Sequence, residues 1–100
     1  MQAIRVQYTV REDFAETNAA NIRAVMDELR ESGAEGIQYT AFRIGDGNTF
    51  VHIVVMASEA QADIVPGLAA FGRFRAALRD GAVTPPTNEA WTVVGTSYAL

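Results

Sequence analysis

The chain has 100 residues and a formal net charge of −4, which suits one domain with a thin core and argues against nucleic acid as a partner. It contains no cysteine, which excludes disulfides, thiolate metal sites and cysteine nucleophiles. No apolar run approaches the roughly 20 residues that span a bilayer, and no basic-then-apolar leader opens the chain. We therefore expect a cytoplasmic protein that binds no membrane.

Periodicity predicts the first half of the chain. Strict alternation over residues 3–10 is typical of a strand. Asp13, with Glu16 three residues later, predicts a capped helix start, and apolar residues then recur at helical spacing. Gly33 is expected to end this helix in a left-handed conformation. Residues 36–44 alternate again and predict a second strand.

A hairpin follows. The cluster at residues 45–48, Gly-Asp-Gly-Asn, is typical of a turn that joins two antiparallel strands. We therefore expect a third strand over residues 49–56. Ser58 with Gln61 then predicts a short helical turn.

The last third of the chain predicts one helix and one strand. Pro66 suits the first turn of a second helix, which Gly81 is expected to end. Pro85 and Pro86 then predict an extended entry into a fourth strand over residues 90–98. Within that strand, Gly95 is expected to mark a bulge or a close backbone approach.

This order predicts an α+β fold of the ferredoxin-like β-α-β-β-α-β kind, with one antiparallel sheet in a single domain over residues 1–100. Two helices can cover only one face of the sheet. The third strand is apolar on both faces, with Phe50, His52, Val54 and Met56 on one and Val51, Ile53 and Val55 on the other. An uncovered apolar face predicts a homodimer. The alternative is a monomer whose long side chains or C-terminal tail cover that face.

The element order, the hairpin GDGNTFVHIVV, the helix LAAFGRFRAAL and the closing PPTNEAWTVVGTSY resemble the dimeric α+β barrel superfamily. That superfamily includes the antibiotic-biosynthesis monooxygenases, and the chain looks most like an uncharacterised bacterial subgroup. All eight basic residues are arginine, which also fits a GC-rich bacterial genome. The resemblance implies two sheets packed back to back and a small-molecule pocket in each protomer.

The resemblance also bears on cofactors. The haem-degrading members use a histidine carried on a helix, and this chain has a single histidine, on a strand, so we expect no haem. The cofactor-free monooxygenases act on polycyclic phenols with Tyr, Trp, Asn and Arg in an apolar pocket. The resemblance therefore implies no cofactor and a small apolar or aromatic ligand.

His52 is the first candidate for catalysis. It is the only histidine and lies among apolar residues on the third strand. In an apolar pocket it would stay neutral near pH 7 and act as a base towards a phenol. The alternative is a buried histidine that is hydrogen-bonded across the dimer interface.

Polar residues on the first two strands are the next candidates. Arg5, Gln7 and Thr9 share one face of the first strand, and Arg43 lies near the end of the second. If they share a cavity with His52, they would suit an anionic or enolate oxygen. We therefore assign Arg43 to catalysis and Arg5 and Gln7 to substrate binding. A salt bridge or a solvent-facing position is the alternative for both arginines.

Three aromatic residues, Tyr8, Tyr39 and Trp91, could stack on a flat substrate and offer a polar tip. We assign Tyr39 to catalysis and the other two to substrate binding, with core packing as the alternative. Phe71 and Phe74 fit a helical stripe and are expected in the core. One histidine with scattered carboxylates lacks the spacing of a metal site.

Three functions follow from this pattern. The first is a cofactor-independent monooxygenase that acts on a small aromatic or enolisable compound. The second is a non-catalytic module that binds or senses a small molecule. The third is a structural dimerisation module with a filled interior and no cavity.

Overall fold

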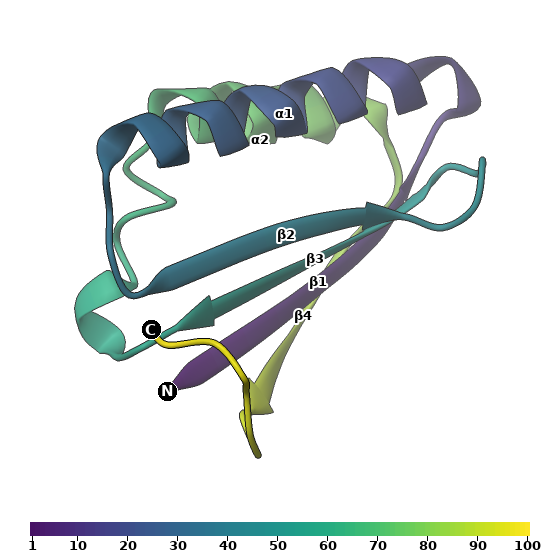
Figure 1. Cartoon of the computed structure of the whole chain (residues 1–100). Coiled ribbons are helices and arrows are strands. Elements are labelled where there is room, and N and C mark those ends of the chain that lie inside the picture. The colour runs from purple at the N-terminus through teal and green to yellow at the C-terminus, as the bar shows by residue number, and fades with distance from the viewer.

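The computed structural model describes all residues from 1 to 100 (Figure 1). Its elements are β1 (Gln2–Val10), α1 (Ala15–Ser32), β2 (Ile37–Arg43), β3 (Thr49–Met56), α2 (Ala69–Gly81) and β4 (Ala82–Thr92). Single 3-10 turns lie at Glu12–Phe14 and Glu59–Gln61. The four strands form one antiparallel sheet in the order β2-β3-β1-β4. The predicted ferredoxin-like β-α-β-β-α-β fold is confirmed.

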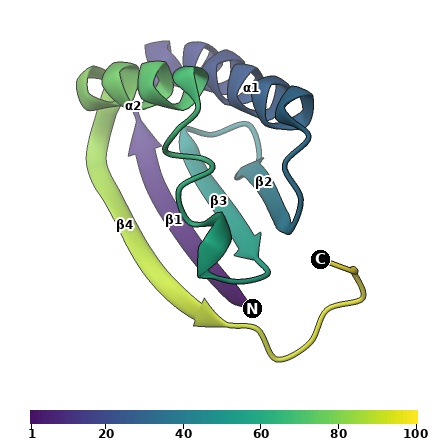
Figure 2. The ribbon, with the colours of Figure 1, turned by 90° about the vertical axis from the view of Figure 1, so that its left-hand side faces the viewer.

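Both helices lie against one face of the sheet, with α1 over the β2 side and α2 over the β4 side (Figures 1 and 2). Because side chains alternate between the two faces along each strand, every second residue points towards the helices and into the core. Its most deeply buried residues include Tyr8 and Val10 of β1 and Phe50 of β3. Neither helix has the length and apolar character needed to cross a membrane.

The first half of the chain follows its sequence pattern except at the start of α1. Gly33 ends the helix with a φ of 67°, as predicted. The predicted cap at Asp13 is wrong, because residues 12–14 form the 3-10 turn and α1 begins only at Ala15. The Asp13 carboxylate instead accepts a hydrogen bond from Arg11 at 3.1 Å.

The predicted hairpin and the turn after it are confirmed. β2 and β3 pair from Ile37 opposite Met56 to Arg43 opposite Phe50, and Gly45 of the turn has a φ of 58°. Ser58 and Gln61 form a reciprocal capping box on the short turn Glu59–Gln61.

The predicted start of α2 is wrong. Pro66 precedes the helix, which begins at Ala69. The carboxylate of Glu28, on α1, accepts hydrogen bonds from the amides of Ala69 and Ala70 at 3.1 and 2.7 Å. A negative charge at this position suits the positive end of the helix dipole. The cap therefore comes from another helix, which the local sequence does not record.

The fourth strand differs from the prediction of residues 90–98. β4 spans Ala82–Thr92, and the last eight residues have no regular structure. β4 is an edge strand, which tolerates proline because one row of its amides needs no partner. The pairing with β1 shifts where Pro85 and Pro86 interrupt it, so the bulge lies there and not at Gly95.

Gly81 offers a test of the packing between α2 and the turn before α1. A Cβ added there would lie 2.3 Å from the ring of Phe14, so we expect Gly81→Ala to lower the free energy of unfolding by about 1–3 kcal/mol. Gly72, in the same helix, has open space around it, so Gly72→Ala should add about 0.5–1 kcal/mol. Urea titrations of both variants measure the difference, and equal effects of the two substitutions would contradict this packing.

Candidate functional site

A cavity of about 820 Å³ lies between the helix-facing side of the sheet and α2, and β4 borders it. This volume falls within the range of small-molecule sites in proteins. Most of its lining is apolar, and the aromatic rings Phe71 and Phe74 project into it from α2. Its polar lining includes three side chains from three different strands, Tyr8, His52 and Tyr39.

His52 lies at the centre of a buried hydrogen-bonded chain. Its Nε2 lies 2.7 Å from the hydroxyl of Tyr8, and its Nδ1 lies 2.6 Å from the hydroxyl of Tyr39. The amide nitrogen of Asn18, on α1, donates to the Tyr8 hydroxyl at 2.8 Å. The chain Asn18–Tyr8–His52–Tyr39 therefore connects α1 with β1, β3 and β2; we call it the polar chain.

The direction of these hydrogen bonds follows from counting donors. Because the Tyr8 oxygen accepts from Asn18, its own proton is satisfied only by donation to Nε2 of His52. The proton of the imidazole then lies on Nδ1 and is donated to the Tyr39 oxygen. The Tyr39 hydroxyl proton has no acceptor within the chain, and Tyr39 lines the cavity. The polar chain therefore ends in one unused donor at the cavity wall.

Burial keeps every group of this chain neutral. It lowers the pKa of His52 from 6.5 to about 4, because desolvation disfavours the imidazolium. Burial likewise raises the pKa of both tyrosines, since it disfavours the phenolates. For Tyr8 the hydrogen bond from Asn18 offsets part of that rise. Near pH 7 the site offers a hydroxyl donor and a neutral imidazole.

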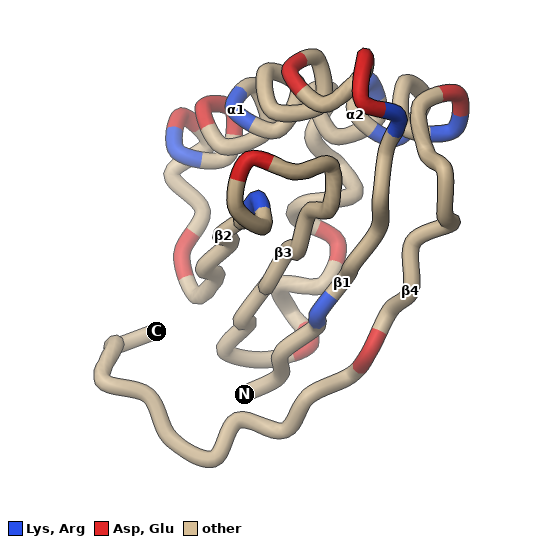
Figure 3. Tube along the Cα trace, turned by 90° about the vertical axis from the view of Figure 1, so that its right-hand side faces the viewer, with Lys and Arg blue, Asp and Glu red and all other residues tan.

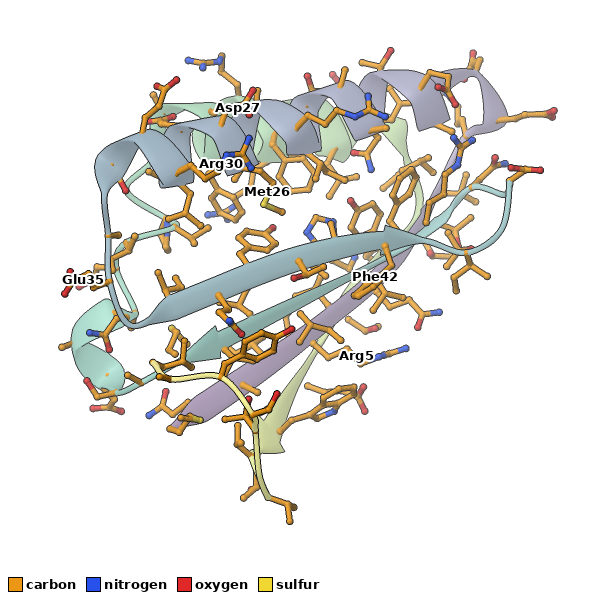
Figure 4. All side chains as sticks on the ribbon, viewed as in Figure 1. Arg5, Met26, Asp27, Arg30, Glu35 and Phe42 are labelled. Atoms are coloured by element: carbon orange, nitrogen blue, oxygen red, sulfur yellow. The ribbon has the colours of Figure 1, made fainter.

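Tyr39 also lines a second hollow of about 460 Å³ between α1 and β2, which is more open to solvent. Its floor is formed by apolar side chains such as Met26 and Ile37, and Figure 4 shows Met26 between α1 and the sheet. Tyr39 thus stands between the two spaces.

The structure separates Arg5 and Gln7 from His52, so the predicted shared cavity is wrong for these two residues. Arg5 pairs with Ile53 and Gln7 with Val51, whereas His52 pairs with Val6. Neighbouring residues of a strand point to opposite faces, so Arg5 and Gln7 lie on the face away from the helices. Figure 4 shows Arg5 and Phe42 pointing away from the helices.

The contacts of Arg5 match the salt-bridge alternative. Its guanidinium forms an ion pair with Glu89 at 3.0 Å and stacks on the ring of Trp91 at 5.7 Å. It also donates to the side chain of Gln7. Trp91 is 42% exposed and lies on this same face, so it does not reach the cavity.

Arg43 lies on the helix-facing side but does not line the cavity. Its guanidinium bonds the Glu16 carboxylate at 2.5 Å and the carbonyl of Gly47 at 2.6 Å, and it lies over the ring of Phe50. The predicted convergence of Arg43 with His52 is therefore wrong, because the hairpin and α1 occupy its donors. Of the predicted residues, the structure brings together His52, Tyr39 and Tyr8.

Asn18, Arg75 and Arg79 are among the polar residues at this site that sequence reasoning missed. Asn18 is fully buried, and its position within the apolar stripe of α1, three residues after Ala15, was the available signal. Arg75 and Arg79 line the cavity from α2. They are one helical turn apart on the same face, but the sequence does not tell which space that face borders.

No protein-family model matches the chain, and no curated protein matches it either. Solved structures match it as folds. An antibiotic biosynthesis monooxygenase has a TM-score of 0.79 at 16% identity, covering 95% of this chain and 100% of its own. Rv0793 from Mycobacterium tuberculosis has a TM-score of 0.80 at 17% identity, covering 97% of this chain and 98% of its own.

SnoaB, a cofactor-independent oxygenase from Streptomyces nogalater, has a TM-score of 0.72 at 16% identity, covering 96% of this chain and 95% of its own. At such identities the likeness shows a common fold. The chain therefore has the fold of these antibiotic-biosynthesis-monooxygenase-like structures, as its sequence resemblance implied.

The lowered pKa of His52 predicts a pH-dependent stability. Between pH 6.5 and about 4 the unfolded chain binds a proton that the folded chain does not, so stability should fall as the pH drops through this window. The loss should approach about 3 kcal/mol and be absent above pH 7. Urea unfolding at several pH values measures it. His52→Gln, which cannot titrate, is the control for the carboxylates, and an identical pH profile in both proteins would contradict the prediction.

Proposed function

We propose that this protein is a cofactor-independent monooxygenase that acts on a small aromatic or enolisable compound bound in the cavity. The observation that carries the proposal is the unused hydroxyl donor of Tyr39 at the end of the polar chain, on the wall of a mostly apolar space. A fixed donor in a water-poor site stabilises negative charge that develops on a substrate oxygen. The fold shared with SnoaB, a cofactor-independent oxygenase, supports the same reaction class.

In this proposal the substrate supplies the electrons. An enolisable CH2 group loses a proton, and its carbanion reduces O2. A C–O bond forms, the resulting peroxide takes up the proton, and its O–O bond breaks, so that one oxygen atom stays on the carbon as a new carbonyl and the other leaves as water. The protein's part is to bind the flat substrate against Phe71 and Phe74 and to place its oxygen at the Tyr39 hydroxyl.

His52 acts through Tyr39 in this scheme. Its Nδ1 carries the proton that it donates to Tyr39, and the lone pair of its Nε2 accepts from Tyr8, so the imidazole has no free lone pair for a substrate proton. Burial also lowers the pKa of His52 to about 4, so the substrate must be acidic enough to ionise without this imidazole as its base. The main contribution of His52 is then to hold the Tyr39 oxygen in position.

The cavity also bears on the alternatives. A purely structural module was expected to have a filled interior, and an open space of about 820 Å³ disfavours it. A non-catalytic binding or sensing module would use the same cavity and the same donor. Oxygen consumption separates it from the enzyme.

The proposed enzyme is tested with Tyr39→Phe. Wild-type protein should accelerate oxygen uptake by an enolisable aromatic such as anthrone, and loss of the hydroxyl should lower kcat/KM by about 10²-fold, the effect of removing one oxyanion donor. Tyr98→Phe, on an exposed tail residue, is the matched control and should leave the rate unchanged. Across a panel of anthrones and naphthols, tight binding without oxygen uptake would establish the non-catalytic alternative.

We also propose that the protein is a homodimer built on the outer face, which we define as the side of the sheet away from the helices. Its apolar members are Ala3, Phe42, Val51, Ile53, Val55 and Trp91. Phe42 is 51% and Trp91 42% exposed, and neither helix reaches them. Figure 3 shows charges gathered on the helices and few on the strands. A second copy related by a two-fold axis is the simplest cover for such a face.

The dimer is tested by placing a charge on this face. Phe42→Asp should convert the protein from twice its 10.8 kDa chain mass to a monomer, because it buries an unpaired carboxylate in the interface. Ala24→Asp puts the same charge on the exposed side of α1 and should leave the mass unchanged. Light scattering after gel filtration gives the mass, and a monomeric wild type would refute the dimer.

A further inference from the structure

The charged residues that border the cavity are all of one sign. Although the chain carries a net charge of −4, the cavity lining includes Arg75 and Arg79 and no aspartate or glutamate. The two arginines lie one turn apart on α2, opposite Pro85, Pro86 and Asn88 of β4. They form a cationic rim at the α2–β4 side of the cavity.

Neither arginine of this rim has a protein anion as a partner. The ion pairs of the structure involve Arg5, Arg11, Arg30 and Arg43, and they leave Arg75 and Arg79 without a carboxylate. Arg75 instead lies over the ring of Phe71 at 5.9 Å, so the cavity wall holds its guanidinium. Two like charges at this spacing on a helix repel each other, and a bound anion would relieve that repulsion.

The rim and the Tyr39 hydroxyl lie towards opposite ends of the cavity. Tyr39 belongs to β2 and the rim faces β4, and these strands are the two edges of the sheet. Three strand spacings separate them, which is about 14 Å. Figure 2 shows α2 on the β4 side of the sheet and α1 on the β2 side. The space between the two ends is lined by apolar and aromatic side chains.

We propose that the ligand of this cavity is an elongated aromatic acid. Its flat apolar body lies between α2 and the sheet, its reactive oxygen meets Tyr39, and a carboxylate or sulfonate at its other end binds Arg75 and Arg79. The planar guanidinium matches such an oxyanion with paired hydrogen bonds. This inference rests on the proposed small-molecule site and adds the chemical class of its ligand.

Two fluorescent probes that differ mainly in one anionic group test the proposal. 8-Anilinonaphthalene-1-sulfonate carries the sulfonate, and N-phenyl-1-naphthylamine has the same aromatic body without it. We expect the sulfonate probe to bind more tightly. Arg75→Gln and Arg79→Gln should each weaken it about tenfold and leave the neutral probe unchanged. Arg73→Gln is the matched control, since Arg73 lies on the same helix but does not line the cavity.

A blocking variant locates the probes. Ile4→Trp fills the cavity from β1 and should abolish binding of both probes, with circular dichroism as the check that the protein stays folded. A probe that still binds to Ile4→Trp binds outside the cavity, and this result would overturn the proposal. Equal affinities of wild type and the two rim variants for the sulfonate probe also overturn it while leaving the small-molecule site intact. Failure of both probes to bind wild type would refute the ligand class and the proposed site together.

Discussion

The structure depends on how His52 is buried. Its ring is 3% exposed and lies among the rings of Tyr8, Tyr39 and Phe74, where an unbonded polar group would cost several kcal/mol. The two tyrosines remove that cost by bonding both nitrogens, and they come from the two strands that flank β3. The imidazole therefore joins three strands at one level, and Asn18 extends the connection to α1.

The same network explains why a chain of this size can keep an open cavity beside its core. Each residue of the polar chain is hydrogen-bonded to the next, so the wall of the cavity is held by hydrogen bonds and does not depend on close packing alone. One acceptor, the side-chain oxygen of Asn18, stays unbonded. As placed, the amide leaves this oxygen and one N–H unbonded; turned over, it would leave both N–H groups unbonded, and buried N–H groups without a partner are rarer than carbonyl oxygens without one. The direction of the chain, and with it the donor at Tyr39, follows from this difference.

The sequence pattern was enough to predict those elements that are determined by residues close together in the chain. The alternation in β1, the glycine at 33 and the turn at residues 45–48 each act within a few residues, and each was found where the sequence placed it. The start of α2 and the extent of β4 depend on residues that are far away in the sequence. The first depends on Glu28 of another helix, and the second on an edge position that accommodates two prolines.

The candidate site divides in the same way. Within a strand, every second residue points to the same face, so Arg5 and Gln7 were correctly grouped together. Between strands, only the register tells which faces coincide, and it places His52 opposite Val6 and away from Arg5. Sequence reasoning could therefore name His52 and Tyr39 as chemically capable. It could not tell which cations share their side of the sheet.

The cavity and the proposed dimer are connected through stability. Only 16 of 100 residues are buried in the single chain. Part of the helix-facing side of the sheet lines the cavity and is therefore not packed into the core. A small domain that gives up core packing needs burial elsewhere. The outer face is the place where a second copy can supply it, because its apolar side chains lie on the opposite side of the same strands. In this view, association stabilises the sheet from one side and so permits the other side to stay open for a ligand.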